Sequence, residues 1–510
     1  RVTVRGVKTF PADAVADRVP LKPGDLAALS AIDQAARAVR TYYGTRGYIR
    51  TEVEPRLTPA GDAVMDLELE VREGRLTNVG KVRIQGNTRT REKVIRREVN
   101  VYPGELFNEA KVAQTEQRLM NLNYFERVTG FPAATGAPGT NDLVIEVVEK
   151  PTGMFTVGAG FSSVDNLVGY MEVSQGNFDL LGWPTFTGGG QRLKLSLRAG
   201  TEMNEYSLSL TEPWLLNRPL ALTLEGYTMG RSYSEYDVKR TGGSAALGFP
   251  TLFGSRLELR YRLERVSVSD VDDDELFTDV DGSTFYYTEE EDQTQSSFGV
   301  TIARDRRDSQ FVPTRGYRVS LGGSVMGGPF GFDTDLYNLI LKAERHQTLW
   351  FRHVLSLRSS AEVVEAFGST DAVPLSERLY AGGARTVRGF ENRDVGPKAW
   401  REFPNPDGST YVEYQPRGGQ TLLLGSGEYT IPLPVPHIRF AAFFDVASLA
   451  VDPFDFRCDE LAWGTGVGIR LDIPGFPIRL DYVLDSGVET DRDRDRTERE
   501  QWSFWIGYGF

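Results

Sequence analysis

Apolar and polar residues alternate with a period of two along most of the chain from Gly153 to Phe510. In "QRLKLSLRAG" (191–200), leucines fall on one face, and arginine, lysine and serine fall on the other. "SRLELRYRL" (255–263), "PLALTLEG" (219–226) and "GYRVSLGG" (316–323) repeat the pattern. Because side chains of a β-strand point to opposite faces in turn, this alternation predicts an all-β region with two chemically different faces.

Two architectures give this alternation. A water-soluble sandwich buries the apolar faces of two sheets against each other. A membrane barrel turns its apolar face outward to lipid and its polar face inward. The polar face here carries Arg, Lys and Glu too often for a sandwich, and the strands are long. We therefore expect a transmembrane β-barrel over 151–510. No apolar run approaches the roughly 18–20 residues of a membrane-spanning helix.

The alternating region divides into sixteen candidate strands. An even number returns the chain to the end of the barrel where it entered. The predicted strands are 153–162, 166–178, 189–200, 203–214, 218–230, 235–248, 253–269, 293–304, 315–326, 331–348, 352–366, 421–430, 437–447, 461–472, 476–485 and 500–510.

The connections between these strands differ at the two ends of the barrel. Connections after even-numbered strands are mostly short and rich in proline, as in "FPTLFG" (249–254) and "DIPGFPI" (472–478). Those after odd-numbered strands include the long acidic segments 270–292 and 486–500. Short inner turns and long outer loops are the arrangement of bacterial outer-membrane barrels. This predicts an outer-membrane barrel, with the N-terminal part on the periplasmic side.

The first 150 residues contain an internal repeat of about 75 residues, which indicates stacked modules. "VTVRGV" (2–7) matches "KVRIQGN" (81–87), and "LELEVREG" (67–74) matches "VIEVVEKP" (144–151). In each copy a segment with helical spacing, at 26–43 and 107–125, lies between these landmarks and follows a Pro-Gly pair that separates two helices. We expect two α+β modules of order strand–helix–helix–strand–strand, over 1–75 and 76–150.

Composition limits the possible functions. The formal net charge of −13 argues against nucleic acid as a partner. A single cysteine, Cys458, cannot form an internal disulfide. No charged-then-apolar secretion signal stands at Arg1, so we expect the printed chain to be a mature or trimmed form.

No catalytic set is evident in the sequence, which predicts that the protein is not an enzyme. His346, His353 and His437 lie on strand or turn segments that are far apart, although His346 and His353 flank one predicted turn. Cys458 has no obvious base beside it. The aspartates of the acidic loops do not follow the spacing of a calcium-binding hand. We therefore expect neither a metal site nor a cofactor.

The segment 367–420, after the eleventh predicted strand, contains "RTVRGFE". A long loop rich in Arg, Gly and aromatic residues is not typical of a floppy linker. The neighbouring strands offer Glu428 and Asp445, and an inward arginine can bind such carboxylates with two parallel hydrogen bonds. We infer that the loop folds into the barrel and is pinned there by Arg388, with Gly389 in a tight turn and Phe390 in an apolar niche. Spacing alone equally allows an ordinary solvated outer loop.

The first and last strands of the predicted barrel both contain glycines, which weaken a strand. "GMFTVGAGFSS" (153–163) has Gly153, Gly158 and Gly160. The last strand, "QWSFWIGYGF", has Gly507 and Gly509 and ends at Phe510. We expect the seam between the two strands to open easily. An open seam exposes backbone groups that template another strand.

Several motifs together resemble the outer-membrane β-barrel assembly factors, the BamA family. They are "GGARTVRGF" (382–390), "GSGEYTIPLP" (425–434), "FFDVAS" (443–448), "WGTGVGIRLDIPGFPIRLDY" (463–482) and the final aromatic strand. The two repeats resemble the POTRA modules of that family. The resemblance implies that Arg388 reaches Glu428 and Asp445.

The resemblance also implies a function without covalent chemistry. It implies that the chain folds and inserts other β-barrel proteins into the outer membrane through a lateral gate. Its partners would be unfolded outer-membrane proteins, periplasmic chaperones, accessory assembly subunits and lipid. Members carry three to five modules and this chain has two, so we expect further modules upstream of Arg1.

Three alternatives remain open from the sequence. A TamA-like assembly factor differs in module number and clients. A POTRA-bearing pore that secretes one partner protein would carry a plug helix ahead of the modules. A passive porin would have an open, conducting interior and no use for the N-terminal modules.

Overall fold

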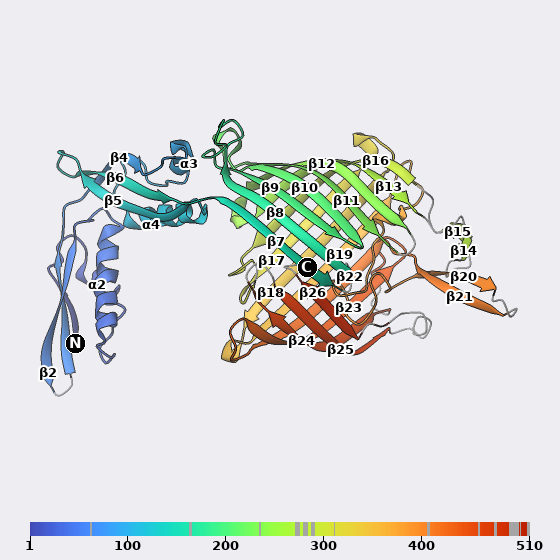
Figure 1. The fold of residues 1–510 in the computed structure, drawn as a ribbon. Coiled ribbons are helices and arrows are strands. Elements are labelled where there is room, and N and C mark those ends of the chain that lie inside the picture. The colour runs from blue at the N-terminus through green and yellow to red at the C-terminus, as the bar shows by residue number, and fades with distance from the viewer. Residues whose placement is uncertain are drawn as a thin grey trace. The chain divides into compact units, whose positions relative to one another are not determined.

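Figure 1 shows the fold of the chain in a computed structural model. The chain divides into two compact units, one of residues 1–153 with 175–192 and the other of 154–174 with 193–510. The residues described are 1–61, 64–162, 166–233, 236–270, 276–278, 284–286, 291–310, 312–404, 409–456, 460–473, 477–488, 499 and 501–506.

The first module has the predicted order strand–helix–helix–strand–strand. Its elements are β1 (Val2–Arg5), α1 (Ala12–Ala16), α2 (Leu29–Gly44), β2 (Glu52–Gly61) and β3 (Val64–Arg72). The sheet order is β1-β3-β2, with β1 parallel and β2 antiparallel to β3. Helix α2 has apolar residues three and four positions apart, and these pack on one face of β3.

The second module repeats this plan. Its elements are β4 (Asn78–Gln85), α3 (Glu92–Arg96), α4 (Glu109–Asn121), β5 (Phe125–Ala134) and β6 (Thr140–Glu149), and the sheet order is β4-β6-β5. The Asn108 side chain caps α4 by accepting hydrogen bonds from the amides of Ala110 and Lys111. No helix among the described residues is long and apolar enough to cross a membrane.

A carboxylate at the end of the last strand closes each module in the same way. Glu73 accepts hydrogen bonds from the amides of Lys8 and Thr9 and from the hydroxyl of Tyr43. Glu149 likewise accepts hydrogen bonds from the backbone amides of residues 88–90, which follow β4. The sequence repeat is therefore also a repeat of side-chain contacts.

The first compact unit also includes residues 175–192, which pack on the second module. Asn177 donates to the Thr90 hydroxyl at 2.8 Å, and the Arg91 amide donates to the Gly188 carbonyl at 2.9 Å. Gly188 has a φ of +102°, and an added Cβ would lie 2.0 Å from the Arg89 carbonyl oxygen. A larger residue at 188 would therefore prevent this contact.

The second unit is built on a single antiparallel sheet of sixteen strands that curves into a nearly closed barrel (Figure 1). This confirms the predicted strand number and fold class. The strands, in sheet order from one edge to the other, are β7 (Gly153–Ser162), β8 (Asn166–Phe178), β9 (Gln191–Gly200), β10 (Met203–Glu212), β11 (Ala221–Ser232), β12 (Asp237–Pro250), β13 (Arg256–Ser269), β16 (Glu291–Asp305), β17 (Gly316–Met326), β18 (Leu336–Thr348), β19 (Val354–Ala366), β22 (Thr421–Pro432), β23 (Ile438–Ala450), β24 (Ala462–Leu471), β25 (Ile478–Val488) and β26 (Trp502–Ile506).

The register of the barrel separates an apolar outer face from a polar inner face. Leu259 of β13 pairs with Val300 of β16, and Leu321 of β17 pairs with Leu341 of β18. Val300, Leu321 and Leu341 are exposed. The residues next to these apolar ones along each strand, such as Arg260 beside Leu259, point to the inner face. Large exposed apolar side chains on alternate residues are what a lipid-facing surface requires.

A second, smaller sheet lies in two of the long loops, where we predicted no strands. Its strands are β14 (Leu276–Thr278), β15 (Thr284–Tyr286), β20 (Lys398–Pro404) and β21 (Thr410–Pro416), in the order β15-β14-β20-β21. Figure 1 shows β20 and β21 extending beyond the barrel strands. Only part of 367–420 is thus available to pack inside the barrel, because β20 and β21 pair with each other in this second sheet.

Candidate functional site

The candidate site is the contact between the loop that follows β19 and the inner wall of the barrel. At its centre is Arg388, whose side chain is 4% exposed. The Arg388 Nε donates to Asp445 Oδ2 at 2.6 Å, and its Nη2 donates to Asp445 Oδ1 at 2.8 Å. These two parallel bonds form the bidentate geometry that a guanidinium makes with a carboxylate.

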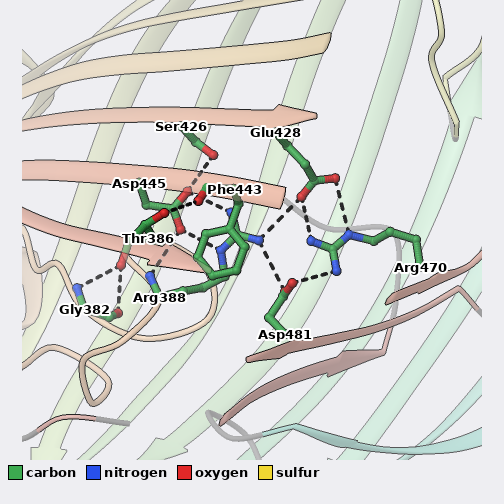
Figure 2. A network of polar contacts seen from close by, with 10 residues as sticks. Gly382, Thr386, Arg388, Ser426, Glu428, Phe443, Asp445, Arg470 and Asp481 are labelled. Carbon is green, nitrogen blue, oxygen red and sulfur yellow. Dashed lines mark hydrogen bonds and ion pairs between the residues drawn. The ribbon is translucent and has the colours of Figure 1, made fainter. Parts of the chain in front are cut away.

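The remaining nitrogen of Arg388 faces two more carboxylates (Figure 2). Nη1 lies 3.5 Å from Glu428 Oε2 and 3.3 Å from Asp481 Oδ2. Arg470 binds the same two side chains from the opposite side, with Nη2 2.7 Å from Glu428 Oε2 and Nη1 2.8 Å from Asp481 Oδ1. Two buried guanidiniums are thus shared among three buried carboxylates.

Two further side chains complete the surroundings of Arg388. The ring of Phe443 lies beneath its guanidinium, with the carbon Cζ 3.5 Å from the ring centroid. Such stacking favours a desolvated cation. The hydroxyl of Ser426 donates to Asp445 Oδ1 at 2.7 Å. Figure 2 shows these groups converging from β22, β23, β24 and β25 on the tip of the loop.

Local sequence explains why the loop can approach the wall so closely. Gly389 has a φ of +102°, a conformation that glycine adopts without strain. The hydroxyl of Thr386 donates to the Gly382 carbonyl at 2.7 Å and accepts from the Gly382 amide at 2.8 Å. On the wall, a Cβ added to Gly464 would lie 1.9 Å from the Arg388 carbonyl oxygen.

Phe390 anchors the loop through burial rather than charge. It is fully buried, as is Val387, in a cluster that combines the loop with the inward faces of β22 and β23. From the wall, Leu422, Ala447 and Leu449 contribute to this cluster. Burying a phenylalanine side chain stabilises the packed state by about 1.5–3 kcal/mol.

The structure therefore brings together all five residues that the sequence assigned to the loop contact. It adds Arg470, Asp481, Phe443 and Ser426, which the sequence analysis did not identify. The motif "WGTGVGIRLDIPGFPIRLDY" contains Arg470 and Asp481 on inward-facing positions of neighbouring strands. An inspection of inward polar positions near Glu428 and Asp445 would have found them.

The other predicted site is the seam between the first and last strands. The sixteen-stranded sheet has β26 and β7 at its two edges, and among the described residues no ladder joins them. The rings of Phe161 on β7 and Phe504 on β26 have centroids 6.3 Å apart, so the two edges come close at this point.

The predicted seam glycines are described only on the β7 side. Gly153, Gly158 and Gly160 lie on β7. The ring of Tyr170 covers Gly158, where an added Cβ would lie 2.5 Å from Cε1. Gly507, Gly509 and Phe510 lie outside the described residues.

Two of the three histidines, His346 and His353, form hydrogen bonds with hydroxyl groups. His346 Nδ1 lies 2.9 Å from the Ser356 hydroxyl, and His353 Nδ1 lies 2.6 Å from the Tyr429 hydroxyl. The described parts of the chain contain no group of three or more candidate metal ligands. Cys458 lies outside the described residues, as do most of the acidic segments 270–292 and 486–500.

Comparison with protein families matches both parts of the chain. The Omp85 superfamily domain matches residues 186–510. The POTRA domain, described as a surface antigen variable number repeat, matches residues 1–74 and 77–150.

Curated relatives are similar along most of this chain. The outer membrane protein assembly factor BamA of Nitratidesulfovibrio vulgaris is 25% identical over 483 residues, which cover 94% of this chain and 58% of that protein. The protein of the same name from Neisseria meningitidis is 26% identical over 458 residues, with 84% and 54% covered. The chain thus spans somewhat more than half the length of these relatives.

Solved structures share the fold. BamA from Haemophilus ducreyi lacking POTRA domains 1–3 superposes with a TM-score of 0.76 at 20% identity, covering 99% of this chain and 98% of that one. CdiB from Acinetobacter baumannii superposes with a TM-score of 0.51 at 14% identity, covering 99% and 88%. At these identities the likeness establishes the architecture alone.

Proposed function

The chain belongs to the Omp85 superfamily, and from this premise we propose that it folds and inserts other β-barrel proteins into the outer membrane. The relatives named above as outer membrane protein assembly factors support this proposal. No covalent step is needed, because the work is the transfer of strands from water into a sheet in lipid.

The observation that carries the proposal is the pair of sheet edges at β7 and β26. Among the described residues these strands have no ladder between them. In lipid each unpaired backbone group costs several kcal/mol, because no water replaces the missing hydrogen bond. A client strand that pairs with either edge removes this cost. The seam is thus a lateral gate that templates the client's first hairpin.

We assign the glycines of β7 the role of keeping this edge easy to open. Glycine loses more conformational entropy than other residues on joining a strand. At Gly158 the position is filled by the ring of Tyr170 from the neighbouring strand, so the outer strand itself contributes little packing. Gly153, Gly160, Gly507, Gly509 and Phe510 are proposed to act with it.

The buried charge cluster has a complementary role in this mechanism. Arg388, Gly389 and Phe390 fasten the loop to Glu428 and Asp445, and the wall strands involved are β22 to β25. These are the strands that lead up to β26. We assign the pinned loop the role of keeping this side of the barrel rigid, so that opening is confined to the seam.

The two modules are assigned to the periplasm, where they receive unfolded clients, chaperones or accessory subunits. Each sheet ends in a long edge strand, β2 in the first module and β5 in the second. Most residues of both strands are exposed or half-buried. An exposed edge binds an extended peptide by adding it as a further strand.

A related candidate is a pore that secretes one partner protein, which the CdiB-like fold would accommodate. A TamA-like assembly factor would use the same seam. Both candidates differ from the proposal in their clients. A passive porin is not favoured, because the loop cluster around Phe390 lies against the inner wall.

A disulfide across the seam tests the gate. Phe161→Cys and Phe504→Cys, in a Cys458→Ala background, replace two side chains that meet across the edges. We expect oxidation of this pair to abolish insertion of a client barrel into vesicles, and reduction to restore it. The matched control is Leu208→Cys with Gly226→Cys, register partners on β10 and β11, whose oxidation should leave insertion unchanged.

Two readouts decide the result. Gel shift on heating establishes that each variant is folded, and mass spectrometry measures the fraction that is cross-linked. Full insertion activity with a complete seam cross-link would refute the gate. Depletion of the protein, followed by a survey of which outer-membrane proteins are lost, separates a general assembly factor from a single-partner secretion pore. Loss of many different barrels indicates the first, and loss of one protein indicates the second.

A further inference from the structure

Three short connections of the barrel share an unusual backbone at their tips. They are the turns around Leu216, Phe253 and Phe351, which follow β10, β12 and β18. The φ and ψ of these residues are 55° and 31°, 66° and 14°, and 53° and 26°. This left-handed conformation is one that glycine and asparagine adopt readily and that bulky side chains disfavour.

Burial within the protein does not account for the choice of residue. Leu216 is 81% exposed, Phe253 is 82% exposed and Phe351 is 84% exposed. The side chains therefore gain almost no hydrophobic stabilisation from the described protein. A bulky apolar residue that is both strained and exposed, at three equivalent places, indicates contact with something outside the chain.

All three tips lie at the same end of the barrel. They follow the fourth, sixth and tenth strands of an antiparallel sheet, so they are at the end where β7 begins. The outer faces of the adjoining strands are apolar, as shown by the exposed side chains of Leu224 on β11 and Leu357 on β19. The tips thus continue the surface that meets lipid.

Two of the tips are accompanied by an exposed arginine within two residues. These are Arg218, near Leu216, and Arg352, next to Phe351. Among the described residues neither arginine forms an ion pair, in a chain whose net charge is −13. An apolar side chain next to an unpaired guanidinium matches the bilayer interface, where acyl chains lie beside phosphate groups.

We propose that these three tips form a membrane anchor on the barrel rim, with Leu216, Phe253 and Phe351 inserted among the acyl chains and with Arg218 and Arg352 bound to lipid phosphates. The anchor sets the depth of the barrel on the inner leaflet. This inference rests on the membrane location in the proposed function. It adds a binding surface that neither the gate nor the loop cluster requires.

Site-specific fluorescence tests the anchor. In a Cys458→Ala background, Leu216→Cys, Phe253→Cys and Phe351→Cys are each labelled with bimane and reconstituted in vesicles of phosphatidylcholine with or without phosphatidylglycerol. We expect quenching by lipid carrying a nitroxide near the headgroup, and protection from aqueous iodide. Leu224→Cys is the control for the lipid-facing wall. Asp371→Cys, in the loop after β19, is the control for water exposure.

The double variant R218Q, R352Q tests the phosphate contacts. In vesicles with phosphatidylglycerol it should increase iodide access to the tips, by roughly fivefold for each arginine lost. Tips that iodide quenches as strongly as Asp371→Cys, while Leu224→Cys is quenched by lipid, would overturn the anchor and leave the barrel in the membrane.

Other outcomes are equally decisive. If neither the tips nor Leu224→Cys contact lipid, the proposed membrane function fails as well. Protection that develops only when an unfolded client is added would identify the tips as a protein-binding surface and overturn the anchor. Since three positions report on one interface, a variant that does not fold leaves two that do.

Discussion

The strongest consequence of the buried charge cluster concerns Arg388→Ala. This change removes both side-chain bonds to Asp445, of 2.6 and 2.8 Å. It leaves that carboxylate buried with hydrogen bonds from the hydroxyl of Ser426 and the backbone amide of residue 388. Glu428 and Asp481 keep a cation, because Arg470 remains 2.7 and 2.8 Å from them. The expected cost is therefore that of one buried carboxylate that has lost its cation.

Breaking a buried ion pair by removing one partner costs about 3–5 kcal/mol. A loop held by this contact should open at least about a hundredfold more often, since about 1.4 kcal/mol corresponds to a factor of ten. The assay is the rate of protease cleavage between residues 380 and 395 in the folded, detergent-solubilised protein. Cleavage follows the population of the open loop when opening and closing are fast.

Two variants bracket the expected result. Arg265→Ala removes an ion pair to Asp292 whose side chains are 67% and 48% exposed, so solvent screens it and the cleavage rate should stay close to that of the unchanged protein. Arg388→Lys keeps the charge and loses the bidentate geometry, so its cleavage rate should lie between those of Arg265→Ala and Arg388→Ala. If Arg388→Ala is cleaved no faster than Arg265→Ala, the reasoning that assigns the loop's stability to this cluster is wrong.

Two further predictions concern Gly464 and Glu73. Gly464→Ala should displace the loop and raise the same cleavage rate, since its Cβ would lie 1.9 Å from a backbone oxygen, whereas Gly427→Ala should not, because its nearest contact would be at 3.7 Å. For Glu73, burial raises the pKa, but hydrogen bonds from Thr9, Lys8 and Tyr43 outweigh it and lower the pKa from 4.5 to about 2. Because the folded pKa is depressed, the stabilisation of the first module is present above pH 4.5 and is lost as the pH falls from 4.5 to about 2. Hydrogen exchange at residues 8–9 in the whole chain should accelerate over that range, and Glu73→Gln should abolish this pH dependence; an identical pH profile in the variant would contradict the assignment.

The sequence alone determined the architecture, because alternation and internal repeats are local properties. Residues such as Leu257 and Arg260 differ in phase along one strand, and period two fixes which face each occupies. The two α+β modules could also be predicted from the sequence, because helical spacing between matching strand motifs is preserved in both copies. Arg388, Glu428 and Asp445 could be proposed together because inward-facing charges in a barrel need partners.

Only the tertiary structure decided what those charges bind. Asp481 is 93 residues from Arg388 in sequence, and their contact depends on the curvature that brings β25 beside the loop. The second sheet could not be predicted from the sequence, because β20 pairs there with β14, which comes from a distant loop. The strained tips at Leu216, Phe253 and Phe351 are likewise invisible in sequence, since left-handed backbone is imposed by the strands that each turn must join.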